Sequence, residues 1–150
     1  MKTVKRVTTK VHKITTSADK QKAQEIRKIV FVEGQQVPEE EEIDQYEEEC
    51  EHFLAWQGAT PCGACRYRFT ENGVKLERFA VLEGFRGQGV GSALVEACLA
   101  DVKQHSQYSG QQLYLNAQLD AIPLYRKYGF ATVGDEFLEC DIRHLKMIKE

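Results

Sequence analysis

Proline is scarce in this 150-residue chain, with three residues, and glycine is moderate, with 11. Disordered chains are usually richer in these residues, so the composition favours a folded protein. Lysine and arginine do not outnumber the acids, at 20 against 23, which argues against a dedicated nucleic-acid-binding protein. No stretch approaches the roughly 20 apolar residues of a membrane span, so no membrane partner is expected.

A secretory signal and an even set of cysteines are also missing. Met1–Ile14 carries several lysines but lacks a continuous apolar core. The five cysteines form an odd set, in a chain long enough to bury a core without disulfides. These features are typical of free thiols in a reducing compartment, and they predict a cytoplasmic protein.

The hydrophobic periodicity predicts a single α/β domain over residues 1–150. We expect seven strands, at Val4–Thr16, His52–Gln57, Cys62–Thr70, Val74–Leu82, Leu113–Leu115, Phe130–Val133 and Phe137–Met147. We expect three helices, from a cap at Ser17 to about Gly34, over about Gly89–His105, and around Ala121–Lys127. Asn72-Gly73 indicates a hairpin, and the acidic run Pro38–Glu51 is interpreted as a solvated loop or short helix. This order gives a mixed sheet with helices on both faces.

The most informative segment is Arg86-Gly87-Gln88-Gly89-Val90-Gly91-Ser92, between an apolar strand and an amphipathic helix. Glycines at a helix start let a ligand approach free backbone N–H groups, which suits phosphate oxygens. A P-loop would need Lys and then Ser or Thr after its last glycine, but Val90 follows Gly89. A dinucleotide fingerprint would need Gly or Ala at Ser92 and an acid about 20 residues further on, so it fits weakly.

The spacing of Arg86, Gly89 and Gly91 resembles the pyrophosphate loop of the GNAT superfamily of N-acetyltransferases. Phe79-Ala80-Val81 resembles the family's fourth strand, and the segment from Ala121 through Tyr125 to Gly129-Phe130 resembles its second hallmark. The front end is similar to a group of small bacterial members, through Ile26-Arg27, Val30-Phe31-Val32, Gln35 or Gln36, Val37-Pro38, Asp44 and His52-Phe53. The resemblance spans nearly the whole chain. It implies a GNAT fold, with a mixed, mostly antiparallel sheet of about seven strands and helices on both faces.

The resemblance also implies an acetyl-CoA-dependent N-acetyltransferase and a set of coenzyme contacts. Backbone N–H groups of Gln88, Gly89, Val90, Gly91 and Ser92, in the loop that includes Arg86 and Gly87, would bind the pyrophosphate. The main chain of Phe79, Ala80 and Val81 would pair with the pantetheine arm and stabilise the oxyanion. The family often has Asn where Gln118 stands, with Asn116 two residues earlier, so either residue is a candidate contact to the arm.

Tyr125 is the residue that the resemblance assigns to protonating the departing thiolate. Its alternative is a core aromatic on a helix. Glu77 is a candidate general base, because two residues before Phe79 on a strand it would share that residue's face. A solvated strand glutamate is the alternative for Glu77, and the amine could equally lose its proton to water or arrive neutral.

Three further residues, Phe31, His52 and His144, are candidates for contacting the acceptor, and both histidines are alternative bases. Each histidine could equally be a structural residue. Cys62-Gly63-Ala64-Cys65 suggests zinc or dithiol chemistry. Residues three apart on a strand point to opposite faces, however, and no second Cys or His pair has metal spacing. We therefore expect no metal.

Two functions follow from these residues: an N-acetyltransferase acting on a primary amine of a small molecule or protein, or an acyl-CoA-binding sensor on the same fold. Tyr125 favours the enzyme. The acidic run, beside the acceptor cleft in the family fold, suggests that Glu47, Glu48 and Glu51 attract a cationic amine, with a solvated connection as the alternative. Oligomeric state, monomer or homodimer, is left open.

Overall fold

A computed structural model of the chain describes residues 8–150. Within them, seven strands form one sheet in the order β1-β2-β3-β4-β5-β7-β6. The strands are β1 (Thr9–Lys13), β2 (Glu51–Gln57), β3 (Thr60–Thr70), β4 (Gly73–Val81), β5 (Leu113–Gln118), β6 (Phe130–Glu139) and β7 (Ile142–Lys149). The helices are α1 (Ser17–Arg27), η1 (Lys28–Glu33), α2 (Glu39–Glu42), η2 (Glu47–Glu49), η3 (Glu83–Phe85), α3 (Val90–Gln104), η4 (Leu119–Ala121) and α4 (Ile122–Arg126).

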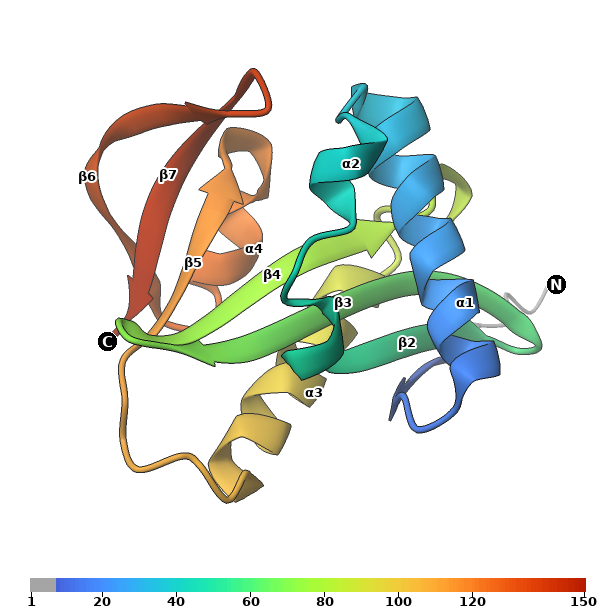
Figure 1. Cartoon of the computed structure of the whole chain (residues 1–150), viewed down its shortest axis with the longest axis horizontal. Helices are drawn as coiled ribbons and strands as arrows, with labels where there is room; N and C mark the ends of the chain where they lie inside the picture. The colour runs from blue at the N-terminus through green and yellow to red at the C-terminus, as the bar shows by residue number, and fades with distance from the viewer. Residues whose placement is uncertain (1–7) are drawn as a thin grey trace, which may run out of the picture.

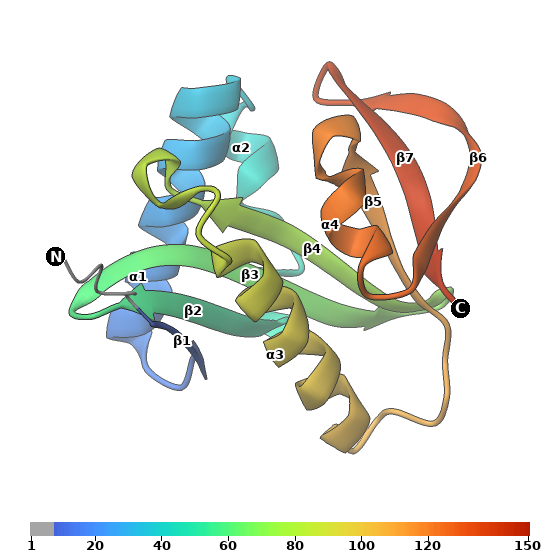
Figure 2. The same ribbon diagram turned by 180° about the vertical axis from the view of Figure 1, so that it is seen from behind.

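Helices cover both faces of the sheet. α1 and α2 lie on the face turned to the viewer in Figure 1, and α3 and α4 lie on the face seen in Figure 2. The larger core cluster contains α3 residues such as Leu94 and Cys98, and the smaller one packs Ile26 of α1 against Ala64 and Ala80. The predicted α/β class, with a seven-strand mixed sheet between helices, is confirmed. In the described part of the chain no helix is long and apolar enough to cross a membrane.

The first strand and helix differ slightly from the prediction. Of the strand expected at Val4–Thr16, Thr9–Lys13 is observed, and residues 1–7 lie outside the described chain. The helix cap is Thr16 rather than Ser17, because the Thr16 hydroxyl accepts the Asp19 N–H at 3.2 Å. The last turns before Gly34 form a π-helix, η1, which widens the helix where Phe31 lies.

The β3–β4 hairpin forms where it was expected, but one residue earlier than the Asn-Gly pair suggested. Thr70 pairs with Gly73, so Glu71 and Asn72 are the two turn residues. Gly73 has a φ of 136°, and a Cβ there would lie 2.0 Å from the Gln112 carbonyl oxygen. Glycine is therefore required here both for this positive φ and for the close approach of the chain that enters β5.

The two closing strands were predicted with the wrong boundary. β6 continues to Glu139, with a bulge between Val133 and Phe137, and the hairpin turn lies at Cys140-Asp141. Both turn residues have positive φ, 50° and 63°, although neither is glycine. The break in the strand pattern at residues 134–136 therefore corresponds to a bulge. The turn itself contains no glycine, so nothing in the sequence marks it.

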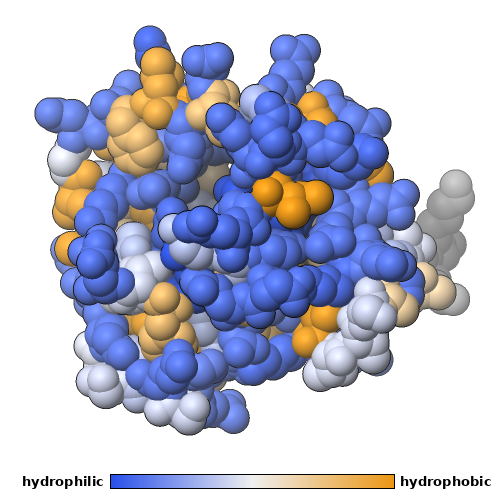
Figure 3. Space-filling view, viewed as in Figure 1, coloured by the Kyte–Doolittle hydropathy of each residue, from blue (hydrophilic) through white to orange (hydrophobic). Residues whose placement is uncertain are grey.

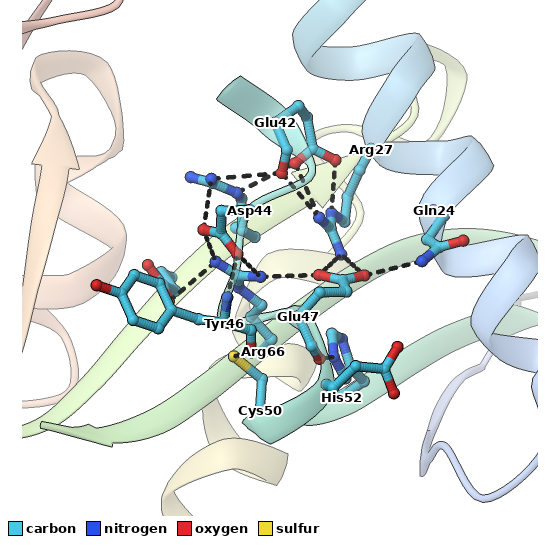
Figure 4. A network of polar contacts seen from close by, with 12 residues as sticks. Gln24, Arg27, Glu42, Asp44, Tyr46, Glu47, Cys50, His52 and Arg66 are labelled. Carbon is cyan, nitrogen blue, oxygen red and sulfur yellow. Dashed lines mark hydrogen bonds and ion pairs between the residues drawn. The ribbon is translucent and has the colours of Figure 1, made fainter. Parts of the chain in front are cut away.

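The acidic run is folded onto the protein rather than solvated throughout. Glu42 and Glu47 are buried and Asp44 is half-buried, and all three face arginines from α1, β3 and β4 (Figure 4). We call this set the arginine–acid network: Arg27, Glu42, Asp44, Glu47, Arg66 and Arg78. Glu39, Glu40 and Glu41 are exposed, as predicted.

Arg27 and Arg66 form the centre of this network. Arg27 Nε lies 2.8 Å from Glu42 Oε1, and Arg27 Nη1 lies 2.8 Å from Glu47 Oε2. Arg66 Nη2 lies 2.6 Å from Asp44 Oδ2, and Arg66 Nη1 lies 2.7 Å from Glu47 Oε1. The network therefore ties the segment that carries α2 and η2 to α1 and β3.

Acidification should weaken this arrangement. Burial alone would raise the pKa of Glu47, but the hydrogen bonds from Arg27 and Gln24 outweigh burial and lower it to about 2, from 4.5. A depressed folded-state pKa means that the stabilisation is full above the unfolded value and is lost as pH falls through the folded value. We expect the free energy of unfolding to drop by about 3 kcal/mol between pH 4.5 and 2 on account of Glu47, since one pKa unit corresponds to about 1.4 kcal/mol.

Denaturant unfolding across that pH range measures this effect. Glu47→Gln removes the titrating group, so its unfolding free energy should change less with pH than that of the unmodified protein. Parallel curves for the two proteins would contradict the assignment.

Candidate active site

A cleft opens where the sheet divides between β4 and β5. In the described chain these parallel strands pair only at Val74↔Leu113 and Lys75↔Tyr114, and they then diverge (Figure 1). The resulting cleft has a volume of about 550 Å³ and is lined from η1, α2, β4, β5, α4 and the β6–β7 hairpin. Figure 3 shows a hollow between the α1–α2 side and the β6–β7 side, on a largely hydrophilic face.

The β4 wall of the cleft contains a bulge at Arg78. Glu77 pairs with Arg66 and Ala80 with Ala64, so two β4 residues, Arg78 and Phe79, lie opposite one residue of β3. Arg78 has a φ of 59°, a left-handed value that is uncommon outside glycine. The extra residue reverses the alternation of faces. Phe79 therefore packs toward α3 and α4, whereas Glu77 faces the arginine–acid network.

The glycine turn leads from β4 into α3. Gly87 and Gly89 have φ values of 74° and 84°, and nothing lies within 4 Å of a Cβ built on either residue. Gly89 is the N-cap of α3 and makes no side-chain cap, which leaves the N–H groups of the first helical turn, Val90 to Ser92, without a partner inside the helix. Arg86 Nε donates to the Val81 carbonyl at 3.1 Å and so ties the turn to the end of β4.

The glycine turn and α4 are packed together. A Cβ on Gly91 would lie 3.1 Å from Leu124 Cδ2, so glycine permits the close approach of α3 to α4. Lys127 of the same region donates to the Ser92 hydroxyl at 3.2 Å. The two segments that sequence analysis singled out therefore form one unit beside the cleft.

Tyr125 of α4 lines the cleft and is 6% exposed. Its ring contacts Phe79 edge to face, with centroids 5.6 Å apart. Burial, with the nearby Cys65 and Cys98 thiols, raises the pKa of Tyr125 well above that of a free phenol. Within residues 8–150 its hydroxyl has no hydrogen-bond partner, so a protonated hydroxyl is available to a molecule in the cleft.

Glu77 lines the cleft, but its carboxylate is paired with three cations. Its carboxylate lies 3.2 Å from Arg66, 2.8 Å from Arg68 and 3.5 Å from Lys75. Burial alone would raise the pKa of Glu77, but these three cations lower it below its usual value. The prediction that Glu77 shares a face with Phe79 is wrong, because of the bulge, and a carboxylate held ionised in this way is a weak proton acceptor.

The two histidines have different surroundings. His52 is buried on β2 with Nε2 2.8 Å from the Glu47 carbonyl oxygen, and it is not among the residues that line the cleft. Burial lowers the pKa of His52. The prediction that His52 contacts substrate is therefore wrong, since its ring is used in packing η2 onto β2. His144 of β7 and Phe31 of η1 both line the cleft.

Asn116 and Gln118 project into the same cleft from β5. Gln118 Nε2 donates to Gln35 Oε1 at 2.8 Å, and Gln35 Nε2 donates back to Gln118 Oε1 at 3.2 Å. This amide pair joins the chain after η1 to the end of β5. Asn116 makes no comparable bond among the described residues, which leaves its amide free for a bound molecule.

The chain and its fold have counterparts among known proteins. Residues 14–150 match the family model described as an acetyltransferase (GNAT) domain. The chain belongs to the GNAT acetyltransferase family. GNAT relatives include the uncharacterized N-acetyltransferase YjcF of Bacillus subtilis (strain 168), which is 40% identical over 126 residues, 83% of this chain and 88% of YjcF.

Two solved GNAT-type structures extend the comparison. An acyl-CoA N-acyltransferase from Pseudomonas aeruginosa superposes with a TM-score of 0.80 at 26% identity, over 95% of this chain and 99% of that one. A GNAT acetyltransferase from Elizabethkingia anophelis with acetyl-CoA bound has a TM-score of 0.64 at 21% identity, over 93% and 94% of the two chains. The predicted family is thus confirmed.

The Cys62-Gly63-Ala64-Cys65 segment has a packing role in this GNAT domain. A Cβ on Gly63 would lie 2.9 Å from Val90 Cγ1, so the glycine lets α3 approach β3. Cys62 and Cys65 both belong to the larger core cluster. The expectation of opposite faces is wrong, because Cys62 is an extra residue at the β2–β3 bulge. Among residues 8–150, no group of three or more His, Cys, Asp and Glu side chains is placed to hold a metal ion.

Several residues of the GNAT cleft were missed at the sequence level. Arg78 lines it, as do Glu41 and Cys140, whose thiol donates to Glu41 Oε2 at 2.9 Å across 99 positions. No sequence spacing brings α2 and the β6–β7 turn together. The bulge at Arg78 could not be predicted either, because arginine is not a residue type that marks a left-handed backbone.

The acidic residues proposed to attract a cationic acceptor lie elsewhere. Glu47 is paired with Arg27 and Arg66, and it does not line the cleft. Glu48 is paired with Lys20, and Glu51 with Lys13, each at 3.1 Å, and these two residues are also outside the described cleft lining. These three carboxylates therefore do not contact a molecule in the cleft, and their attraction of a cationic acceptor stays a prediction.

Proposed function

We propose that the protein is an acetyl-CoA-dependent N-acetyltransferase that moves an acetyl group to a primary amine. The observation that carries this proposal is the junction of an unpaired β4 edge with the glycine turn and the uncapped start of α3. Free N–H groups of Val90, Gly91 and Ser92 suit pyrophosphate oxygens, which the partial positive charge of a helix start also attracts. The open space at Gly87 and Gly89 supports the fit.

The pantetheine arm would lie along β4 as an added strand. Beyond Lys75 the described part of β5 no longer pairs with β4, so the main chain from Phe79 to Val81 has room for such pairing. Asn116 is the better placed of the two β5 amides to contact the arm, because Gln118 is already paired with Gln35. A main-chain N–H in this stretch would stabilise negative charge on the thioester oxygen.

The test is thiol release from acetyl-CoA by the purified protein, measured against a panel of primary amines and checked by the mass of the acetylated product. Turnover with one or more amines is expected. Coenzyme binding without turnover across cationic, neutral and anionic amines would favour the acyl-CoA sensor. Absence of coenzyme binding would contradict both functions.

Tyr125→Phe should lower kcat about 100-fold or more while leaving the Kd for acetyl-CoA nearly unchanged. The substitution removes the proton donor to the departing thiolate, whereas the ring that packs on Phe79 remains. Steady-state kinetics and calorimetric binding measure the two quantities.

Tyr128→Phe is the matched control for this variant. The Tyr128 hydroxyl lies 3.0 Å from Glu96 Oε1 and 3.3 Å from the Ser92 carbonyl oxygen, and the residue does not line the cleft in the described chain. Its kcat should stay close to that of the unmodified enzyme. Equal activity of the Tyr125 variant and this control would refute the acid role.

A further inference from the structure

The cleft has two sides, and the groups on them differ. Tyr125 and Phe79 belong to the side packed against α3 and α4. On the other side, His144 of β7 lies opposite Gln118 of β5 in the sheet register and points away from Leu145 and Met147, which pack toward the core. An amine that enters from the α2 side would therefore meet His144, while the departing sulfur would meet Tyr125.

The contacts of His144 define which nitrogen can accept a proton. Nδ1 lies 2.7 Å from the Ile142 carbonyl oxygen. A carbonyl only accepts, so Nδ1 carries the hydrogen and the lone pair of the neutral ring is on Nε2. The ring also stacks on Phe137, with centroids 5.8 Å apart and an interplanar angle of 22°. These contacts fix the ring and its tautomer.

Nε2 of His144 makes no hydrogen bond within residues 8–150, although the residue is only 6% exposed. Glu139 Oε2 on the cleft rim lies 3.6 Å from Nε2, within ion-pair distance but beyond hydrogen-bond distance. At that position the carboxylate can pair with the imidazolium once Nε2 holds a proton. A buried ring with one fixed nitrogen and one open nitrogen, aimed into a cleft, has the arrangement of a general base.

Apart from the exposed residues Asp120 and Glu139, the acidic groups that line the cleft are already engaged. Glu42 is paired with Arg27 and Arg78, and Glu77 with three cations. Glu41, facing from α2, accepts the Cys140 thiol hydrogen from the β6–β7 turn. Among the described residues of this half, His144 alone presents a buried and open proton acceptor.

We propose that His144 is the general base that takes the proton from the acceptor amine, with Glu139 as its positioning residue. This proposal rests on the proposed acetyltransferase function. The amine nitrogen forms its bond to the thioester carbonyl carbon and gives one proton to His144 Nε2. The C–S bond breaks with its electron pair on sulfur, which takes the Tyr125 hydroxyl proton. The proton on His144 then returns to the Tyr125 oxygen through solvent, so both residues are restored.

His144→Asn tests the proposal, because the asparagine amide can still donate to the Ile142 carbonyl but offers no nitrogen at the Nε2 position. With the best amine from the panel at saturation, kcat should fall about 100-fold or more, the usual contribution of general base catalysis. The Kd for acetyl-CoA should not change. In the unmodified enzyme kcat should rise with pH and then level off, and the variant should lose that plateau.

His52→Asn is the matched control, since His52 is also a buried strand histidine bonded to a main-chain carbonyl but outside the cleft. It should keep the plateau. If His144→Asn does not fold, Glu139→Gln on the exposed rim replaces it, with a smaller loss of kcat and a displaced plateau expected.

Full activity of His144→Asn, or a lower kcat with the plateau retained, overturns the role of His144. An unchanged dependence of kcat on pH in Glu139→Gln overturns the role of Glu139. Where this variant replaces an unfolded His144→Asn protein, the same result overturns the role of His144 as well. Failure of the unmodified protein to release thiol is a separate outcome, because it refutes the acetyltransferase function before any variant is made.

Discussion

Replacing Arg66 by methionine is expected to lower the free energy of unfolding by about 3–5 kcal/mol, the usual cost of removing one partner from a buried ion pair. The Arg66 side chain has no exposed surface, and it faces Asp44, Glu47 and Glu77 at 2.6, 2.7 and 3.2 Å. Methionine fills much of the volume of the arginine stem but leaves these carboxylates short of one cation. Their mutual repulsion in a buried site is then the main cost.

This loss is large compared with the total stability of an ordinary domain, about 5–15 kcal/mol. Lys20→Met is the matched control. Lys20 lies 3.1 Å from Glu48, but the Glu48 side chain is 91% exposed. A surface pair of this kind contributes roughly 0–1 kcal/mol. Denaturant unfolding at neutral pH measures both variants, and a similar small loss in each would show that the buried network is not a major source of stability.

The arginine–acid network also connects stability to the cleft. It fixes the segment with Glu41 and Glu42, which lines the side of the cleft proposed for the acceptor, to β3 and β4. Weakening it should therefore disturb acceptor binding more than coenzyme binding, because the glycine turn lies at the other end of β4.

The sequence was sufficient for the parts of the fold that depend on local patterns. The glycine turn, the amphipathic α3 and the Gly129 stop after α4 each follow from short-range geometry: positive φ, helical periodicity and a left-handed residue. Gly129 has a φ of 86°, as a C-terminal glycine would. These same features carried the resemblance to the GNAT family.

The features that were missed depend on partners distant in sequence. Nothing in the acidic run shows that Glu47 meets Arg27 and Arg66, 20 and 19 residues away. Alternation along β4 predicted a shared face for Glu77 and Phe79, and one left-handed residue, Arg78, reversed it. Tertiary packing determines both the partners of Glu47 and the bulge at Arg78, so no local sequence pattern could reveal them.

Gly89→Val is expected to raise the Kd for acetyl-CoA about 100-fold or more, which corresponds to about 3 kcal/mol. Gly89 has a φ of 84°, and a β-branched residue is strongly disfavoured at such values. Valine would therefore move the turn and redirect the N–H groups at the start of α3. Hydrogen bonds to a charged group contribute about 1.5–3 kcal/mol each, so losing one or two accounts for the effect.

Folding should survive this change better than binding does. Nothing lies within 4 Å of a Cβ at Gly89, so the valine side chain starts in open space, which is the space proposed for the pyrophosphate. Gly84→Val is the matched control: Gly84 lies just before the same turn, has equally open surroundings and lacks a positive φ. Its Kd should stay within the range of the unmodified protein. Calorimetric titration with acetyl-CoA, alongside thermal unfolding of both variants, separates the effect on binding from the effect on folding. A folded Gly89→Val protein with unchanged affinity for acetyl-CoA would show that the coenzyme does not bind at this turn.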